Sequence, residues 1–291
     1  MAAQGQTFFL CSFDGGAAPG GTNFGAADWN YLTDVGGTEL NMTNNGSGWQ
    51  AEQVWDYQFA QGASTGGYDL NMPIPDYQKG VNMTAVGGST SYRNIPDVAM
   101  VADNIEVVYT IVNSTNGAII QTNYITAAGG TSAAAPLWAA FTSLVNQQAR
   151  AMGRPPMGFL NPAIYEIGLG SNYHNCFHDI TVGNNTNAAS DNLFFAAPGY
   201  DLCTGWGSPN GANLINALVG YTGPVFVDFN YTGGVQNGAF YTPFPTLAQG
   251  VGAVSNNGTI FIETAGSSPE TINIDKPMKI TAMNGTATIG N

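Results

Sequence analysis

The residues best suited to chemistry lie around one serine in the middle of the chain. Residues 129–138 read Gly-Gly-Thr-Ser-Ala-Ala-Ala-Pro-Leu-Trp. Apolar residues then recur at the i, i+3, i+4 spacing of a buried helix face: Leu137, Ala140, Phe141, Leu144 and Val145. We expect a helix with Pro136 in its first turn, where a proline needs no N–H partner, and Ser132 at or just before the helix N-terminus.

A serine at that position has two interpretations. The unpaired N–H groups and the dipole at a helix N-terminus favour negative charge, so Ser132 could attack a carbonyl if a base takes its proton. Serine is also a common N-cap residue, and the local pattern alone favours this second role.

Acidic residues on loops are the next candidates. The apolar run from Gln6 to Ser12 predicts a buried strand that leads into Asp14, at the sheet edge where α/β proteins commonly carry functional side chains. An Asp before glycines is, by itself, also typical of a turn. Asp179 and Asp201 lie on Gly-rich loops, which suits either a hard cation such as Ca²⁺ or a pair of Asx turns.

One further acidic pair needs separate consideration. Glu52 and Asp56 are four residues apart, which on a helix would place both carboxylates on one face. His174 and His178 lack zinc-ligand spacing with any third ligand, so we interpret them as surface or supporting residues.

The serine motif resembles that of a known group of enzymes. Gly-Thr-Ser-x-x-x-Pro is shared by subtilisins and by sedolisins, the serine-carboxyl peptidases. Subtilisins typically have His after that proline, whereas this chain has Leu137-Trp138, which is similar to sedolisins. Further segments resemble sedolisin motifs: 35–38 (Val-Gly-Gly-Thr), 52–55 (Glu-x-Val-Trp) and 93–99 (Arg-x-x-Pro-Asp-Val-Ala).

The resemblance implies roles for the candidate residues. Ser132 would be the nucleophile, and Asp14 would complete the oxyanion hole, which requires a protonated carboxyl that donates a hydrogen bond. Phe13 stands where the family usually has Gly. The calcium site that the resemblance implies has five ligand residues: Asp179, Ile180, Ala197, Gly199 and Asp201.

The order of the motifs bears on the catalytic base. Sedolisins use a Glu-x-x-x-Asp pair that precedes the oxyanion Asp, whereas Glu52 follows Asp14 and matches a structural position. We therefore expect the base pair, and a propeptide, upstream of Met1, and we expect this chain alone to be inactive.

The resemblance implies an α/β fold with a subtilisin-like, mostly parallel sheet and flanking helices, incomplete at its N-terminus. Residues 1–220 would form the peptidase domain, and residues 221–291 a truncated β-rich module. Its β runs (225–227, 259–262 and 278–281) weakly resemble the first rungs of a parallel β-helix. Two β-rich segments, 107–112 and 119–125, predict a hairpin just before Ser132.

Composition excludes several function classes. The formal net charge of −13 makes nucleic acid and anionic membranes poor partners. No run of eighteen apolar residues predicts a membrane span, and residues 1–5 do not resemble a signal peptide. The three cysteines exclude a disulfide-dense scaffold, although Cys176 and Cys203 could pair.

The sequence therefore favours a secreted, acid-acting serine endopeptidase with protein or peptide substrates. Two alternatives stay open. One is a non-catalytic binding or adhesion protein that keeps the fold, and the other is a subtilisin-type peptidase whose triad histidine lies upstream.

Overall fold

The computed structural model divides the chain into two compact units, Met1–Val219 and Gly220–Asn291. It describes residues 6–20, 29–43, 46–57, 62–115, 118–154, 156–221, 223–234, 236, 238, 243–254 and 258–290, with the side chains of residues 115–120 excepted. Residues 1–5, which do not resemble a signal peptide, lie outside the described residues. The division falls one residue before the boundary that we expected from the sequence.

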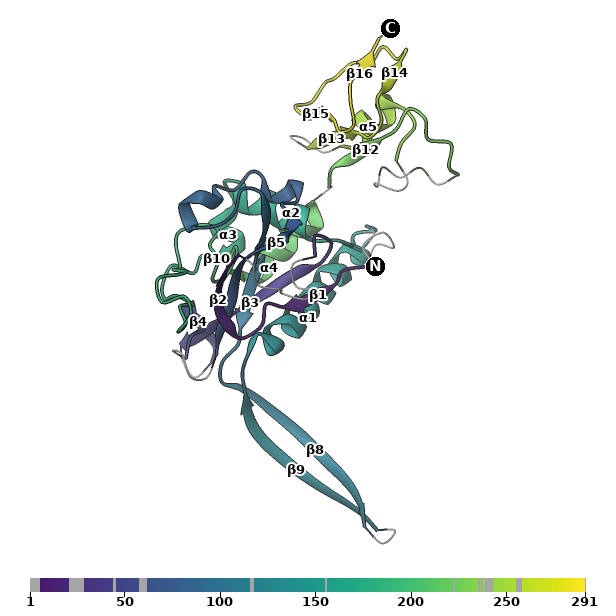
Figure 1. The fold of residues 1–291 in the computed structure, drawn as a ribbon. Helices are drawn as coiled ribbons and strands as arrows, with labels where there is room; N and C mark the ends of the chain where they lie inside the picture. Colours follow the sequence, from purple (N-terminus) through teal and green to yellow (C-terminus); the bar gives the residue numbers. More distant parts are fainter. Residues whose placement is uncertain are drawn as a thin grey trace. The chain divides into compact units, whose positions relative to one another are not determined.

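The first unit is built on a sheet whose core pairs are parallel (Figure 1). Strand β3 (Thr33–Thr43) pairs in parallel with β1 (Phe9–Cys11) and with β7 (Val98–Val101), and it pairs antiparallel with β4 (Gly48–Val54). A Cβ atom on Gly37 of β3 would lie 2.7 Å from the Cβ atom of Ala102. The sheet therefore requires glycine at this position, because a larger residue has no space.

A second small sheet lies next along the chain. Strand β2 (Gly15–Pro19) pairs in parallel with β5 (Ala63–Pro73), which pairs antiparallel with β6 (Tyr92–Ile95). Two 3₁₀ helices, η2 (Asp76–Gln78) and η3 (Met83–Val86), connect β5 to β6.

Helix α1 (Thr131–Ala151) packs against β1, β3 and β7, and its start and its buried face differ from our expectation. It begins at Thr131, so Pro136 lies inside it and leaves the Ser132 carbonyl without a helical N–H partner. The residues that it buries are Thr131, Ala134, Ala135, Trp138, Thr142, Val145 and Ala149. Of the five residues that we expected on the buried face, only Val145 is buried. The helix instead buries the small residues Ala134, Ala135 and Ala149 together with Trp138.

Three shorter helices complete the first unit: α2 (Asn161–Leu169), α3 (Tyr173–Cys176) and α4 (Gly211–Gly220). The short strands β10 (Phe177–His178) and β11 (Ser208–Pro209) pair antiparallel between α3 and α4. All three cysteines are free thiols, so the pairing of Cys176 with Cys203 that we considered is wrong.

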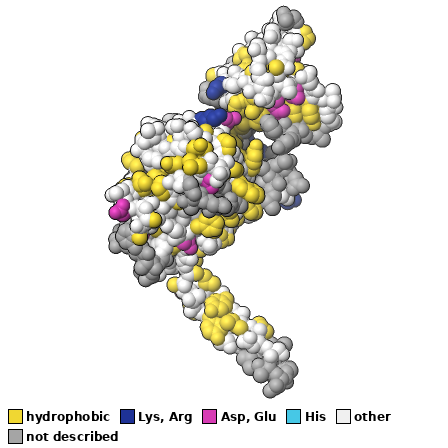
Figure 2. Space-filling view, viewed as in Figure 1, with side chains coloured by type: hydrophobic (Ala, Val, Ile, Leu, Met, Phe, Trp, Pro, Cys, Tyr) yellow, Lys and Arg dark blue, Asp and Glu magenta, His cyan; other side chains and the backbone are white. Residues whose placement is uncertain are grey.

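A long hairpin extends away from the body of the first unit (Figure 1). Its strands, β8 (Ile105–Thr115) and β9 (Ala118–Ala128), are each longer than predicted. Their antiparallel register is unbroken from Ile105↔Ala128 to Thr115↔Ala118. Hydrophobic side chains are exposed along it (Figure 2), with Ile125 at 72% and Val108 at 66%.

The second unit has parallel β strands. Strands β12 (Val225–Val227), β13 (Thr259–Ile262) and β15 (Lys279–Ala282) form one parallel sheet. Strands β14 (Gly266–Ser268) and β16 (Ala287–Ile289) form another. Helix α5 (Leu247–Ala253) packs on β12, and the core comprises Val225, Val227, Leu247, Val251, Val254, Ile260 and Ile262.

Throughout the described part of the chain, no helix is both long and apolar enough to cross a lipid bilayer.

Candidate active site

The carboxylate of Asp14 meets the N-terminus of α1. Its Oδ1 accepts hydrogen bonds from the Thr131 backbone N–H (2.9 Å) and from the Thr131 hydroxyl (2.8 Å). Gly130, the N-cap residue, has φ +100°, and a Cβ atom there would lie 2.8 Å from Asp14 Oδ2. A residue 117 positions away therefore caps α1, and glycine at position 130 makes room for its carboxylate.

Ser132 follows in the first turn of α1, and its side chain is exposed. Its Oγ lies 3.8 Å from Cys11 Sγ, a long and weak contact. The N-cap is Gly130, and no side chain of the cap residue bonds to the helix. The interpretation of Ser132 as an ordinary N-cap is therefore wrong. The structure brings Ser132 and Asp14 to the same helix turn.

Hydrogen bonds from distant strands fix the turn that carries Asp14. The Phe13 carbonyl accepts from Thr65 N (3.0 Å), and the Asp14 carbonyl accepts from Ala63 N (3.1 Å). Gly15 N donates to Thr65 Oγ1 (2.8 Å). These contacts hold the main chain on both sides of Asp14, so its carboxylate is positioned before any ligand binds.

Phe13 adopts a left-handed conformation in this turn, with φ +72°. Such a conformation costs roughly 1–2 kcal/mol for a residue with a Cβ atom and little for glycine. The turn thus keeps a glycine-type geometry although the side chain is aromatic. The strain is maintained by the surrounding hydrogen bonds.

The two aspartates predicted to bind calcium hold one loop from both sides. Asp179 Oδ1 accepts from the Tyr173 hydroxyl (2.9 Å), and both Asp179 oxygens lie 3.1 Å from Gly199 N. Asp201 Oδ2 accepts from Ala197 N (3.0 Å). Burial, followed by the charge of Asp179, raises the pKa of Tyr173.

Asp201 itself is completely buried, and it forms the Asx turn that we considered. Its Oδ1 accepts from Cys203 N and Thr204 N, each at 2.8 Å. Burial raises the pKa of Asp201 to about 7, against the lowering effect of these hydrogen bonds.

These loops fit a hard cation. A buried carboxylate without a positive partner costs free energy, which a cation beside it would offset. Two carboxylates and neighbouring backbone carbonyls are the donors that Ca²⁺ prefers. Residues Ile180, Ala197 and Gly199 belong to the two segments that these contacts bring together, and the Ile180 side chain is buried. Among the described residues, no group of three or more His, Cys, Asp or Glu side chains could hold a metal ion.

Glu52 and Asp56 do not share a helix face. Glu52 lies on strand β4, where its carboxylate accepts from Thr38 Oγ1 (2.7 Å), Trp49 Nε1 (2.9 Å) and the Ser208 hydroxyl. Asp56 follows the strand in an isolated bridge. The helical pair considered from the sequence is therefore wrong, and the contacts of Glu52 tie β4 to its neighbours.

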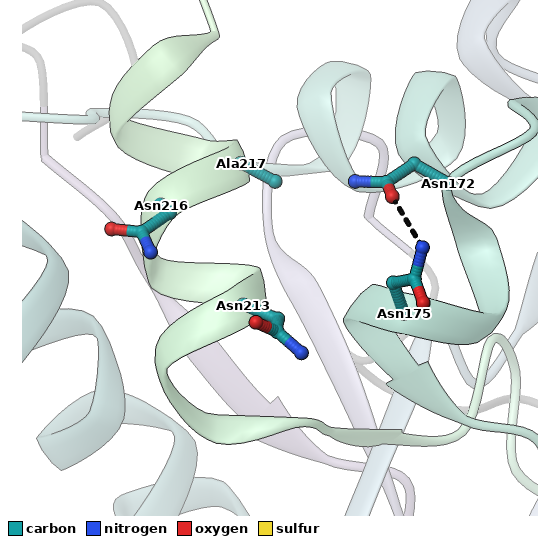
Figure 3. Close-up of a pocket in the computed structure, with 5 residues that line it drawn as sticks. All are labelled: Asn172, Asn175, Asn213, Asn216 and Ala217. Atoms are coloured by element: carbon teal, nitrogen blue, oxygen red, sulfur yellow. Dashed lines mark hydrogen bonds between the residues drawn. The ribbon is translucent and has the colours of Figure 1, made fainter.

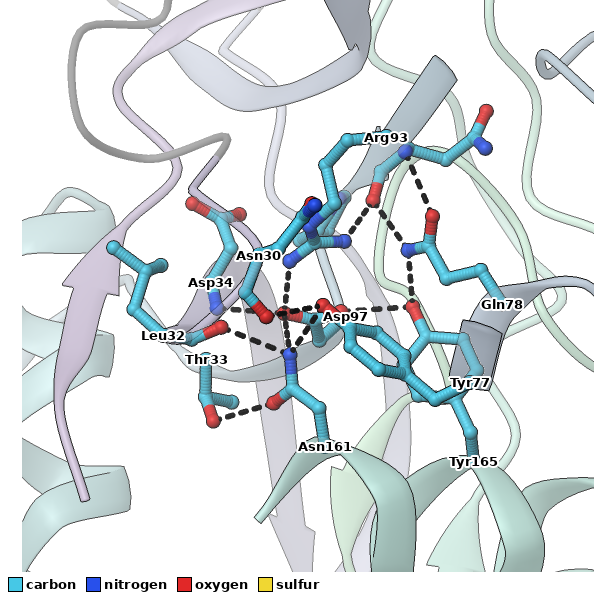
Figure 4. Close-up of polar contacts among 12 residues, drawn as sticks. Asn30, Leu32, Thr33, Asp34, Tyr77, Gln78, Arg93, Asp97, Asn161 and Tyr165 are labelled. Carbon is cyan, nitrogen blue, oxygen red and sulfur yellow. Dashed lines mark hydrogen bonds and ion pairs between the residues drawn. The ribbon is translucent and has the colours of Figure 1, made fainter. Parts of the chain in front are cut away.

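A buried polar network joins β3, η2, β6 and α2 (Figure 4). Arg93 and Asp97 form an ion pair at 2.6 Å with both side chains fully buried. Tyr165 donates to Asp97 Oδ1 (2.8 Å), and burial, followed by the charge of Asp97, raises the pKa of Tyr165. Asn161 donates to Asp97 Oδ2 (3.1 Å) and accepts from the Thr33 hydroxyl (2.6 Å). This network supports the fold.

The histidines play no part in the site. His178 is half-buried and stacks on Trp49, with ring centroids 4.3 Å apart. Burial lowers the pKa of His178, against the opposite effect of Glu52.

A polar cavity of about 450 Å³ lies elsewhere on the first unit (Figure 3). It is lined by Asn172, Asn175, Asn213, Asn216 and Ala217. These amides offer no acid, base or nucleophile, and neither Ser132 nor Asp14 lines the cavity.

Sequence reasoning missed two contacts of the site. It assigned no role to the Thr131 hydroxyl, which holds Asp14, or to Cys11, which lies against Ser132. A signal for Cys11 was its position three residues before Asp14, at the end of the same strand.

The sequence is similar to those of three known peptidases. No family model matches the chain. Kumamolisin of Bacillus sp. (strain MN-32) is 35% identical over 226 residues, which is 75% of this chain. Tripeptidyl-peptidase 1 of Homo sapiens is 31% identical over 244 residues, also 75% of this chain. Aorsin of Aspergillus oryzae is 29% identical over 248 residues, 72% of this chain.

The chain belongs to the sedolisin family. The matched part of the chain spans only 37% of kumamolisin, 38% of tripeptidyl-peptidase 1 and 35% of aorsin. The α/β architecture of the first unit, with its parallel strands and flanking helices, agrees with a subtilisin-like sedolisin fold. Sedolisins are the serine-carboxyl peptidases, so the chain belongs to that peptidase family.

Proposed function

We propose that this chain supplies the nucleophile and the oxyanion acid of a serine-carboxyl endopeptidase that cleaves proteins at acidic pH. The observation that carries the proposal is the contact of Asp14 with Thr131, the residue immediately before Ser132. It brings an acidic group and a hydroxyl to one helix N-terminus, where developing negative charge is stabilised.

In this mechanism, Ser132 Oγ attacks the scissile carbonyl, and the carbonyl oxygen becomes an oxyanion. Oδ1 of Asp14 already accepts two hydrogen bonds, so Oδ2 is the oxygen that carries a proton and donates it as a hydrogen bond to the oxyanion. The role requires the carboxylic acid form of Asp14, which can donate this hydrogen bond.

The base that takes the Ser132 proton is a Glu/Asp pair, expected upstream of Asp14 in the order of the family's motifs. An upstream propeptide and secretion, or delivery to another acidic compartment, accord with an acid-acting peptidase. We expect residues 1–291 without that pair to be inactive, because an unassisted serine is a poor nucleophile at acid pH.

The test is cleavage of casein near pH 4 by this chain and by a version extended upstream. We expect the extended version to cleave, Ser132→Ala to abolish cleavage, and Asp14→Ala to lower kcat by about 10²–10³. Asp14→Asn keeps an N–H donor for the oxyanion and should lower kcat less than Asp14→Ala does. Cleavage that survives Ser132→Ala would contradict the proposal, and cleavage by the short chain would contradict its inactivity.

We also propose that Ca²⁺ binds between Asp179 and Asp201, with the carbonyls of Ile180, Ala197 and Gly199 as further ligands. The buried Asp201 carboxylate supports this site because a cation would neutralise it. At 100 times its Kd, Ca²⁺ should stabilise the fold by about 2.7 kcal/mol, visible as a higher Tm than in EDTA.

Asp201→Asn and Asp179→Asn should abolish the calcium effect on Tm. Asp191→Asn, which changes an exposed aspartate between the two loops, should keep it. An equal Tm in Ca²⁺ and in EDTA for the unmodified chain would exclude the site.

The two alternatives lose support. An aromatic residue in place of the family's Gly at position 13 would suit a non-catalytic binding or adhesion protein, but the turn keeps a glycine-type φ and Asp14 contacts the start of α1. The subtilisin-type alternative does not explain an aspartate at position 14 or the paired aspartate loops. An upstream sequence without a Glu-x-x-x-Asp pair would favour the non-catalytic binding protein.

A further inference from the structure

The side chain of Phe13 is not explained by the fold. In the described part of the chain, Phe13 (φ +72°) and Asn104 (φ +51°) are the non-glycine residues with positive φ. Asn tolerates this region because its short polar side chain bonds locally, whereas a bulky aromatic residue does not. A glycine at position 13 would satisfy the same backbone with less strain.

The main-chain hydrogen bonds hold the strained turn at Phe13, but burial of its side chain does not compensate for the strain. The residue is 45% exposed, so much of its apolar surface faces water. The contacts that fix the turn are made by the main chain, such as Thr65 N to the Phe13 carbonyl (3.0 Å), and would form equally with glycine. Strained residues held in this way concentrate at functional sites.

The position of Phe13 connects it to the nucleophile. Two residues earlier, Cys11 Sγ lies 3.8 Å from Ser132 Oγ, and one residue later, Asp14 Oδ1 bonds to Thr131. Phe13 therefore lies between two residues that both contact the first turn of α1. Its exposed ring is therefore carried by the residue next to Asp14 in the chain.

We propose that Phe13 is a specificity-determining residue, whose exposed ring contacts an apolar substrate side chain next to the scissile bond. The inference rests on the proposed peptidase function, since it names the substrate class of the same site. Removal of apolar surface from water on both partners favours large apolar residues over small or polar ones. For a half-exposed ring, the preference should be about tenfold in kcat/KM.

The experiment uses the protein extended upstream and peptides that differ in one residue, Leu or Phe against Ser or Gln, on either side of the cleaved bond. Phe13→Leu should keep the apolar preference. Phe13→Gly and Phe13→Ala should both lose it. Because glycine also relieves the strain, Phe13→Gly should unfold at a higher temperature than Phe13→Ala, which separates loss of the ring from a change in the turn.

A matched control is Tyr109→Ala, which removes an aromatic residue of similar exposure (41%) from the hairpin. We expect this variant to keep the preference. The inference is overturned if Phe13→Gly and Phe13→Ala cleave with the same apolar preference as the unmodified protein, or if Tyr109→Ala loses it equally.

A binding measurement separates this inference from the proposed function. In the Ser132→Ala background, apolar peptides should bind about tenfold more tightly than polar ones, and Phe13→Gly should remove the difference. If cleavage fails but this binding difference appears and depends on Phe13, only the catalytic proposal fails. If cleavage depends on Ser132 but Phe13 changes neither binding nor selectivity, only this inference fails.

Discussion

The turn that carries Asp14 and the hairpin β8–β9 both adjoin the N-terminus of α1, but they are held in opposite ways. Residues far away in the sequence fix the turn: Val35 through Ser12, Thr65 through Phe13, and Thr131 through Asp14. The hairpin is held by its own ladder and by local pairs, such as the stacked rings of Tyr109 and Tyr124, 5.3 Å apart.

This difference indicates which segment positions the residues at the start of α1. A two-stranded hairpin is marginally stable by itself in water, so the hairpin cannot set the position of Ser132. The turn, in contrast, is tied to β3, β5 and α1 at once. Three variants, taken from the largest expected effect to the smallest, can break or sharpen the comparison.

The largest effect should come from the buried ion pair in the body of the first unit. Arg93→Met leaves the Asp97 carboxylate buried without its cation and should lower the free energy of unfolding by about 3–5 kcal/mol in urea titrations. The double variant Arg93→Met with Asp97→Leu removes both charges and should recover part of this loss. A single variant as stable as the unmodified chain would mean that the network does not hold the body together.

An intermediate effect is expected at the turn. Asp14→Ala removes the acceptor for two Thr131 donors at the start of α1 and should lower the free energy of unfolding by about 1 kcal/mol. Asp14→Asn keeps an acceptor oxygen and should lose less. If urea titration finds Asp14→Ala unchanged in stability, the long-range support of the turn is not real.

The smallest effect is expected on the hairpin. Ile125→Ala should change the free energy of unfolding by less than about 0.5 kcal/mol, because Ile125 is 72% exposed. The same substitution at fully buried Ile164 of α2 should lower it by about 2–5 kcal/mol. Hydrogen exchange should likewise be faster for amides of β8 and β9 than for those of β3. Equal losses at both isoleucines would mean that the hairpin is covered in solution.

The sequence singled out Ser132 and Asp14 by residue type and order, and the structure places both at the start of α1, while their catalytic roles stay predictions. The elements around them were predicted less well. The start of α1 was misplaced because Pro136 suggested a first turn, and its buried face was misjudged because Ala134 and Ala135, not the larger Leu137 and Leu144, meet the sheet. Small residues carry little hydrophobic signal even where they permit the closest packing.

Strand pairing between residues far apart in the sequence explains another difference between the predicted and the observed elements. The spacing of Glu52 and Asp56 suits a helix, but antiparallel pairing with β3 makes residues 48–54 a strand. In the second unit, residues 225–227 and 259–262 were predicted to the residue because β-branched and aromatic runs between turns need no distant information. The strain at Phe13 could not be predicted, since it arises from contacts with β5.

The hairpin also affects how the protein behaves in concentrated solution. From residue 105 to residue 128, Glu106 is the only charged residue, although the chain as a whole carries −13. Near the sequence pI of about 4.1, the overall charge falls to zero and copies no longer repel one another. Under the acidic conditions that suit the proposed chemistry, association of copies therefore depends on the exposed apolar side chains of the hairpin. Substitutions that add charge to the hairpin are the first choice for raising solubility.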